Sequence, residues 1–376
     1  MFYFKGKEVL KEVRKRIAKY SFERASKRIQ REKQKREEEE KEGGKGGGGG
    51  IREEDLKTSH LFEQIKNMSY FSSEIGDMRP LSSCSFSPDG ESIASSCWSG
   101  DCKVWSLKDG KQTHLLSGHI ERSQHIKWIP LKDLSPTCCN LISCGADNVA
   151  HLWPLKNEES EMETNQVGSV KPIATLSGHT NRINRVGVHP SGSFCATTSF
   201  DNTWRYWDLE TNEELFIQEG HYKAVYGISF HPDGSLAGTI GLEGVTRIWD
   251  LRTGKTVLSF EDHVKNGLCI DFSPNGIHFA TGAADNTVRI YDLRKKSSIH
   301  NIPAHLNMIT NVCFQPNDGK YLVSSSFDKT VKFWSTIDYT PLKTLGGHDG
   351  RISYVDVSVN DCISTVSFDK TIKLAK

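Results

Sequence analysis

A histidine, in several copies as the pair Gly-His, is followed about 28 residues later by an aromatic residue, and this repeat runs along most of the 376-residue chain. Its clearest copies are His179, His221, His263 and His305, each 42 residues after the one before. An internal period of about 40–45 residues with such marks is typical of a β-propeller, in which every repeat forms one four-stranded blade. A propeller is a platform, so we look for function on its faces and its appendages.

Seven repeats can be aligned between about residue 70 and the end of the chain. Near the end of its third strand, each repeat has an equivalent position that is usually aromatic. The first repeat has Gly76-Asp77 in place of Gly-His. The chain stops on the third strand of the last blade, so the fourth strand must come from residues near 70–74, which closes the ring and leaves no open sheet edge. The predicted fold is all-β, a seven-bladed propeller. The seven aromatic positions hold Trp105, Trp153, Trp207, Trp249, Tyr291, Trp334 and Ala375.

The chain before the propeller has a different composition. Residues 1–36 carry 14 Lys and Arg against 4 Glu, although the whole chain has a formal net charge of only +1. Apolar residues at steps of three and four predict an amphipathic helix over 8–20, and Ser21 suits the N-cap of a second helix. A weak helical pattern follows over 52–68. We therefore predict a short basic α-helical arm over 1–42, a glycine-rich linker and strap over 43–69, and the propeller over 70–376.

Composition also argues against several classes of protein. No apolar run approaches 18 residues, and the first residues lack the apolar stretch of a secretory leader. The ten cysteines form no CxxC pair and no zinc-type cluster, so we interpret most of them as small buried residues in a reducing compartment. No phosphate-binding loop or HExxH motif occurs. We expect no metal, no cofactor and no enzymatic activity. Insertions at 131–140 and 157–170 should be surface loops.

Two repeats contain a His, a Ser, an Asp and a Trp at matching offsets, which resembles a catalytic triad in composition. A structural interpretation is preferable, because the set recurs around a ring whereas a catalytic site is needed once. In this interpretation the Asp accepts from the His, the His holds a Ser or Thr, and that hydroxyl meets the Trp indole. Repeats one, four, five and seven depart from the set and should depend more on apolar packing. The residues are His179, Ser199, Asp201 and Trp207 in repeat three, and His305, Ser326, Asp328 and Trp334 in repeat six.

One face of the propeller, which carries the turns between the second and third strands, is the candidate protein-binding surface. The residues just before the turn Asp are aromatic in four of seven repeats, and the loops after Gly-His are rich in cations. Such a ring suits an acidic peptide or a phosphate backbone. The alternative is that the aromatics pack between blades and the cations are ordinary solvated residues. The candidates are Trp98, Phe200, Leu242, Phe327 and Phe368, with Arg122, Arg182, Lys223, Lys265 and Arg351.

The basic arm is the second candidate surface. Its cations suit RNA phosphates or nuclear import. The alternative is a solvated helix, and the glutamates at 37–40 limit the basic field. The cations assigned to this surface are Arg14, Lys15, Arg16, Arg24, Lys27, Arg28 and Arg31.

The arm and the propeller together resemble a known family, the WD40-repeat subunit of the U4/U6 small nuclear ribonucleoprotein (pre-mRNA-processing factor four). Residues 17–28 resemble the helical motif that precedes the propeller of that family, and residues 73–80 resemble its first blade, with Asp in place of His. The His and Trp-Asp marks alone would indicate only a WD40 propeller. Further similar stretches lie at 94–100, 218–221, 233–238 and 341–345, and the resemblance covers about residues 8–36 and 70–376.

This resemblance implies a non-enzymatic scaffold of the U4/U6 and U4/U6·U5 particles, which acts in pre-mRNA splicing in the nucleus. Its expected partners are companion protein subunits of these particles and, directly or through one of them, U4 and U6 snRNA. The family's segment associated with cyclophilin binding is missing upstream of the arm, so the chain looks N-terminally shortened and cyclophilin is a doubtful partner. We expect no membrane partner and a monomeric propeller within the complex. The alternative is a WD40 adaptor of another class, such as a ubiquitin-ligase substrate receptor or a signalling scaffold.

Overall fold

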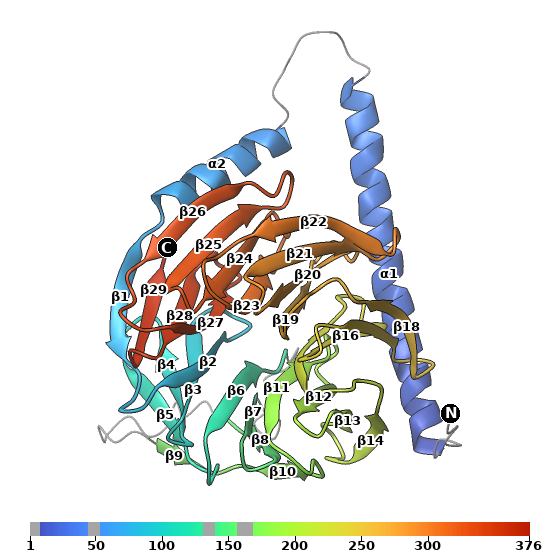
Figure 1. Ribbon diagram of the computed structural model, residues 1–376. Helices are drawn as coiled ribbons and strands as arrows, with labels where there is room; N and C mark the ends of the chain where they lie inside the picture. Colours follow the sequence, from blue (N-terminus) through green and yellow to red (C-terminus); the bar gives the residue numbers. More distant parts are fainter. Residues whose placement is uncertain (1–7, 44–52, 131–139, 156–167) are drawn as a thin grey trace.

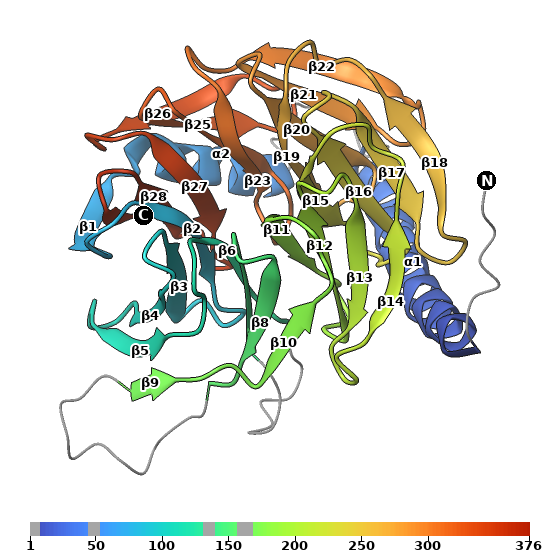
Figure 2. The ribbon, with the colours of Figure 1, turned by 60° about the horizontal axis from the view of Figure 1, so that its bottom comes forward.

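Seven β-sheets radiate from a common axis in the computed structural model, which describes residues 8–43, 53–130, 140–155 and 168–376 (Figures 1 and 2). The sheets are the blades of a seven-bladed β-propeller, as the repeat predicts. Each blade is antiparallel in its first four strands. Seven apolar clusters form the core, and each is built largely from the facing surfaces of neighbouring blades.

The strands follow the repeats closely, and each blade is numbered here after its repeat. Blade one contains β2 (Leu81–Phe86), β3 (Ser92–Cys97), β4 (Cys102–Ser106) and β5 (Gln112–Leu116). Blade two contains β6 (Ser123–Trp128), β7 (Leu141–Gly145), β8 (Val149–Trp153) and β10 (Ala174–Ser177). Blade three contains β11 (Ile183–Val188), β12 (Phe194–Ser199), β13 (Trp204–Asp208) and β14 (Glu214–Gln218).

The remaining blades repeat this order from the axis outward. Blade four contains β15 (Val225–Phe230), β16 (Leu236–Gly241), β17 (Thr246–Asp250) and β18 (Lys255–Phe260), and blade five contains β19 (Gly267–Phe272), β20 (His278–Ala283), β21 (Thr287–Asp292) and β22 (Ser297–Pro303). Blade six contains β23 (Ile309–Phe314), β24 (Tyr321–Ser326), β25 (Thr330–Ser335) and β26 (Pro341–Gly346). Blade seven contains β27 (Ile352–Val357), β28 (Ile363–Ser367), β29 (Thr371–Ala375) and β1 (Tyr70–Ile75).

The ring closes in blade seven, where the first strand of the propeller pairs with the last. β1 runs antiparallel to β29, with Tyr70 opposite Ala375. The Tyr70 ring lies edge-on to the His348 ring, at 5.9 Å between centroids, and so brings an aromatic residue to the blade that lacks the repeat's Trp. Backbone hydrogen bonds between Ser69 and Lys376 continue the pairing by one residue. The two ends of the propeller therefore stabilise each other.

Blade one carries a fifth strand. β9 (Gly168–Val170) pairs in parallel with the outer strand β5, so the last residues of the second insertion form a strand rather than a loop. This corrects the expectation of a surface loop over all of 157–170. The rest of that insertion, and most of the first one at 131–140, lie outside the described residues.

The arm is one continuous helix, α1 (Glu8–Gly43), instead of two helices divided at Ser21. The Ser21 side chain is buried, and its hydroxyl donates to the Ala18 carbonyl of the same helix at 3.0 Å, so it does not cap a new helix. No glycine or proline interrupts the sequence between Glu8 and Gly43. Nothing local therefore ends the helix until the glycines begin.

Helix α1 packs on the propeller face that carries the turns between first and second strands, such as residues 190–193, 232–235 and 274–277. We call this the helix face, and Figure 1 shows α1 along blades three to five. Val13 and Ile17 are buried in a cluster with aromatic residues of blades three and four. The Tyr20 hydroxyl donates to the Pro190 carbonyl at 2.8 Å. Arg28 bonds Asp233 at 2.6 Å and the Asn275 carbonyl at 3.1 Å.

A second helix, α2 (Glu53–Asn67), packs on blades six and seven. Ile65 and Met68 are buried in a cluster that includes Tyr321 and Phe333. Lys343 of β26 donates to the last turn of α2 through the Lys66 carbonyl, at 2.5 Å. The predicted strap is therefore an ordered helix that leads directly into β1.

Two features of the structure bear on the class of protein. Neither α1 nor α2, nor any other part of the described chain, offers a helix long and apolar enough to cross a lipid bilayer. None of the eight described cysteines forms a disulfide, and seven of them are buried. Burial raises the pKa of the Cys84 and Cys144 thiols, which makes them unreactive small core residues.

The junction between α1 and the propeller should be sensitive to acid through His189. This residue lies beneath Tyr20, at 5.6 Å between ring centroids, and its Nε2 donates to the Gly234 carbonyl at 2.8 Å. Burial lowers the pKa of His189 from 6.5 to about 4. As the pH falls, the unfolded chain binds the proton first, so stability is complete above pH 6.5 and is lost towards pH 4. Through this residue alone, the fall from pH 6.5 to pH 4 should lower the free energy of unfolding by about 3 kcal/mol.

The measurement compares urea unfolding of the wild type with that of His189→Gln between pH 6.5 and pH 4. Other buried histidines, among them His151 and His231, contribute equally to both proteins. The variant should therefore show a shallower loss of stability with falling pH. Identical pH slopes would mean that His189 is not held neutral in the fold.

Candidate functional site

Six blades contain a hydrogen-bonded relay that ties the loop before the first strand to the body of the sheet. In blade three His179 Nδ1 donates to Asp201 at 2.8 Å, and His179 Nε2 accepts from the Thr197 hydroxyl at 2.8 Å. The Trp207 indole N–H donates to the same Thr197 oxygen at 2.9 Å. Every polar atom of this buried relay thereby has a hydrogen-bond partner. The bonds stabilise the loop and leave no group of the relay free for chemistry.

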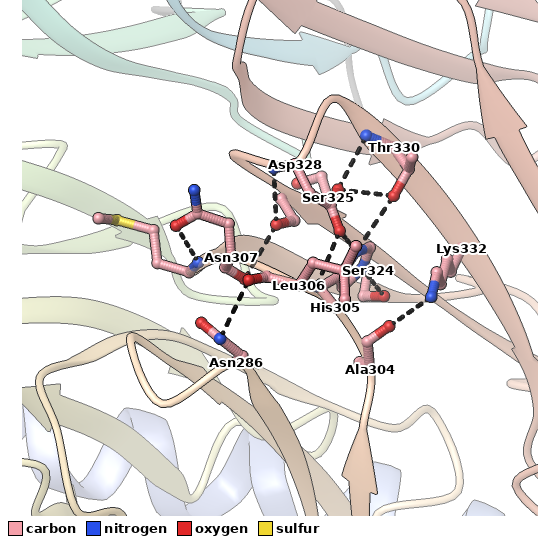
Figure 3. Close-up of polar contacts among 12 residues, drawn as sticks. Asn286, Ala304, His305, Leu306, Asn307, Ser324, Ser325, Asp328, Thr330 and Lys332 are labelled. Atoms are coloured by element: carbon pink, nitrogen blue, oxygen red, sulfur yellow. Dashed lines mark hydrogen bonds and ion pairs between the residues drawn. The ribbon is translucent and has the colours of Figure 1, made fainter.

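Figure 3 shows the corresponding relay of blade six, with His305 between Asp328 and Ser324. The Trp334 indole completes it at 3.0 Å from the Ser324 oxygen. Beside it, the Lys332 ammonium donates to the Ala304 carbonyl at 2.7 Å, so the loop is held at two adjacent residues. Equivalent His–carboxylate–hydroxyl sets are His119–Asp147–Ser143, His221–Glu243–Thr239, His263–Asp285–Thr281 and His348–Asp369–Thr365.

The structure corrects the identity of the hydroxyl in this relay. Ser199 and Ser326 are not the residues that meet the histidine and the indole. They lie at the strand ends, where Ser199 donates to the Asn181 carbonyl at 2.9 Å and Ser326 to the Asn307 carbonyl at 3.0 Å. The relay hydroxyl lies two residues earlier, because the indole reaches over the neighbouring strand to the middle of the sheet and not to its end.

Blades one and four, in which a residue of the relay is replaced, have more polar contacts than the sequence suggests. In blade four Glu243 replaces the Asp and lies 2.7 Å from His221 Nδ1, so the relay is complete. The expectation that this blade depends more on apolar packing is therefore wrong. In blade one Asp77 pairs instead with the Lys103 ammonium at 3.1 Å. Burial works to raise the pKa of Asp77, but the Lys103 ammonium and two backbone N–H groups outweigh it and leave the pKa lowered.

The pKa shifts of three relay residues, His221, His348 and Asp369, do not suit acid–base work at neutral pH. Burial lowers the pKa of His221 and His348, so both rings are neutral. Burial works to raise the pKa of Asp369, yet the donors Thr371 and His348 hold it at about 2. A neutral imidazole and a permanently ionised carboxylate form a static hydrogen bond.

The face opposite α1 carries the turns between second and third strands, such as residues 98–101 and 200–203, and we call it the 2–3 face. Three predicted cations there lie over three predicted aromatics. The guanidinium carbons of Arg122, Arg182 and Arg351 are 4.4, 3.7 and 5.3 Å from the ring centroids of Trp98, Phe200 and Phe327. All three arginines are exposed and all three aromatic rings are half-buried. Stacking in this way holds the cations in place while their N–H groups stay open to a partner.

The aromatics of blades one, six and seven also contact one another. Phe368 lies edge-on to Trp98 at 5.1 Å and to Phe327 at 5.7 Å. The structure thus brings three of the aromatic candidates into one cluster, while Phe200 stands apart on blade three. Leu242 is half-buried at the equivalent place on blade four, and Lys223 and Lys265 are exposed in the loops of blades four and five.

The 2–3 face has an apolar feature that the sequence argument missed. The residue directly after the relay histidine, or after Asp77 in blade one, is a large apolar side chain in five blades. These side chains are almost fully exposed: Met78 84%, Ile120 92%, Tyr222 84%, Val264 87% and Leu306 91%. Isolated exposed apolar residues are common, but five at one structural position form a pattern. Comparing the residue that follows the histidine in each aligned repeat would have revealed this pattern in the sequence.

The basic arm is less available than its charge suggests. Arg28 is bonded to Asp233, and Arg16 pairs with Glu210 at 3.0 Å. Arg24 donates to Tyr20 at 2.5 Å, and Arg14 is half-buried. The three remaining cations assigned to this surface, Lys15, Lys27 and Arg31, are exposed. Two cations of the predicted RNA surface, Arg16 and Arg28, therefore hold the helix to the propeller.

One group of described residues could supply three ligands to a metal ion. The ligand atoms of His119, Asp147 and His151 lie within 4.8 Å of one another. Both ring nitrogens of His119 are already used, by Asp147 at 2.9 Å and by Ser143 at 2.8 Å. His151 is bonded to Thr175 at 3.0 Å. A metal ion would have to break the relay of blade two, so this group carries no metal-site proposal.

Comparison with known proteins agrees with the fold. The family model for the WD domain, G-beta repeat, matches residues 75–106, 170–208, 212–250, 254–292, 296–335 and 339–375. The unmatched stretch between the first two segments holds β5 of blade one and β6, β7 and β8 of blade two, the blade whose turns carry the two insertions. The chain therefore belongs to the WD40-repeat family.

Several relatives of the chain are named as U4/U6 small nuclear ribonucleoproteins. The chain is 46% identical to the U4/U6 small nuclear ribonucleoprotein PRP4-like protein of Arabidopsis thaliana over 375 residues, which cover 99% of this chain and 62% of that protein. It is 31% identical to the U4/U6 small nuclear ribonucleoprotein PRP4 of Saccharomyces cerevisiae over 207 residues, 55% of this chain and 40% of that protein. The expected resemblance to the Prp4 group of WD40 proteins is thereby confirmed. The chain spans less than two thirds of the length of these relatives.

Proposed function

We propose that the chain is a non-enzymatic scaffold of the U4/U6 and U4/U6·U5 particles, which acts in pre-mRNA splicing in the nucleus. The names of its relatives support the particle, and the similarity to the Arabidopsis protein runs through both the arm and the propeller. The structural use of the His–carboxylate–hydroxyl sets supports a scaffold rather than a hydrolase, because each set recurs around the ring with its polar atoms satisfied.

The 2–3 face is the proposed site for a companion protein of the particle. The observation that carries this proposal is the ring of exposed apolar side chains around arginines that are stacked on aromatics. Apolar residues and arginine are the groups that dominate the energy of protein interfaces. The opposite face is partly covered by α1, which leaves the 2–3 face as the open platform.

Association with U4 and U6 snRNA is proposed as direct or through a companion protein. Four of the seven arm cations are bonded to the propeller, bonded within the helix or half-buried, so direct contact would depend on Lys15, Lys27 and Arg31. Phosphate contacts of so few cations are weak at physiological salt. A partner bound to the 2–3 face is therefore the stronger route to the RNA.

The experiment is a pull-down of the tagged full chain from nuclear extract, followed by sequencing of the recovered RNA. We expect U4 and U6 snRNA to be enriched together over other abundant nuclear RNAs. Recovery of ubiquitin-ligase or signalling subunits, with no enrichment of either RNA, would reject the proposal in favour of a WD40 adaptor of another class.

A further inference from the structure

Helix α1 has a second apolar stripe besides the one that docks on the propeller. Ala18, Phe22, Ala25 and Ile29 follow one another at steps of four, three and four residues, so they lie on one side of the helix. At 100° per residue, Phe22 lies about 140° around the helix from the buried Ile17. Phe22 is 66% exposed and Ile29 is 46% exposed. The stripe therefore points away from the propeller.

The spacing of this stripe fits another helix. Large residues at steps of seven, with small residues between them, allow a second helix to approach closely and pack its side chains around Phe22 and Ile29. Ala18 and Ala25 supply the small positions. A solvated helix with no partner has no need of two large apolar residues one heptad apart.

The charges beside the stripe define the partner further. Lys15, Lys19 and Lys33 are exposed along its flank. Among the residues that the structure describes, these lysines form no ion pair, unlike Arg16 and Arg28 on the docked side. Unpaired cations beside an apolar seam favour a partner helix with Asp or Glu at its flanking positions.

From these observations we propose that the outer side of α1, formed by Ala18, Phe22, Ala25 and Ile29 with Lys15, Lys19 and Lys33, binds an acidic amphipathic helix of a partner protein. The docked stripe makes this surface rigid before binding, because the buried Ile17 and the Arg28–Asp233 bonds fix α1 against the propeller. Binding then orders only the partner. The site is separate from the 2–3 face, so it can exist whether or not the chain assembles with U4/U6 RNA.

The test uses the full chain with a photo-crosslinking phenylalanine analogue at position 22, and with the analogue at position 257 as a control. Val257 is a residue of similar exposure, 55%, on the propeller strand β18. After irradiation in nuclear extract, mass spectrometry identifies the cross-linked peptide. We expect position 22, and not position 257, to cross-link to a segment with apolar residues at heptad spacing and flanking Asp or Glu.

A synthetic peptide of that segment then supplies the affinity measurement by fluorescence anisotropy. We expect Phe22→Asp to weaken binding at least about tenfold, which corresponds to the loss of about 1.4 kcal/mol, and Lys15→Glu with Lys19→Glu to weaken it further at low salt. Val257→Asp should bind like the wild type. Cross-linking of position 22 to RNA, to a second copy of the chain, or to nothing would overturn the proposal, as would equal affinity of wild type and Phe22→Asp.

Discussion

Replacing Thr197 by valine should lower the free energy of unfolding by about 2–4 kcal/mol, although the two side chains have the same shape. The change removes only the hydroxyl that accepts from the Trp207 indole and donates to His179 Nε2. Thr197 is fully buried, so water cannot replace either bond. Each buried polar group left without a partner costs about 1–3 kcal/mol. Urea unfolding followed by tryptophan fluorescence gives the number.

Ser199→Ala is the matched control, because it removes a hydroxyl from the same strand. The Ser199 hydroxyl bonds only the Asn181 carbonyl and the Asp201 backbone N–H, at the turn. Both bonds lie in a partly buried region, where water can replace them, so we expect a loss of only about 1 kcal/mol. If Ser199→Ala costs as much as Thr197→Val, the relay does not pass through Thr197.

Replacing Ile17 by aspartate should release helix α1 from the propeller. Ile17 is 1% exposed in the cluster with Phe194, Tyr206 and Trp249, so the change creates a cavity and buries a charge. Losing such a side chain costs about 2–5 kcal/mol before the charge is counted. Hydrogen exchange of the α1 amides should accelerate by about a hundredfold or more, while the inner strands of the blades keep their protection.

Phe22→Asp is the control for this prediction. It places the same charge on the same helix, at a side chain that is 66% exposed on the outer stripe. Exchange of the α1 amides should then remain close to that of the wild type. Equal acceleration in the two variants would show that aspartate destabilises the helix itself and that docking through Ile17 is not what holds it.

The ring of blades was predictable because its marks have physical causes that recur. A loop histidine needs a turn carboxylate, and an indole needs a hydroxyl, so these residues recur at fixed offsets in most repeats. The same logic placed the missing strand of blade seven near residues 70–74, where β1 lies. The continuity of α1 was not predictable from Ser21 alone, because a buried serine that bonds its own helix and a serine that caps a new one look identical in sequence.

The sequence predicts which face of the propeller carries the candidate residues, but not which side chains contact one another there. The offsets from the turn Asp and the loop His put Arg122, Arg182 and Trp98 on one face, where the structure has them. Which cation stacks on which ring depends on loop geometry that no offset encodes. The use of Arg28 by Asp233, 205 residues away, depends on packing of the whole arm, and it turns a predicted RNA contact into an internal bond.

The central claim is that the 2–3 face holds a companion protein of the U4/U6 particle. The most direct measurement compares recovery of U4 and U6 snRNA from nuclear extract by the wild type, by Arg122→Glu/Arg182→Glu/Arg351→Glu, and by Lys111→Glu/Lys295→Glu/Lys296→Glu. The control cations are exposed in turns on the opposite, helix face. We predict that the arginine variant loses at least about nine tenths of the RNA and that the lysine variant keeps it. Full recovery by the arginine variant would contradict the claim.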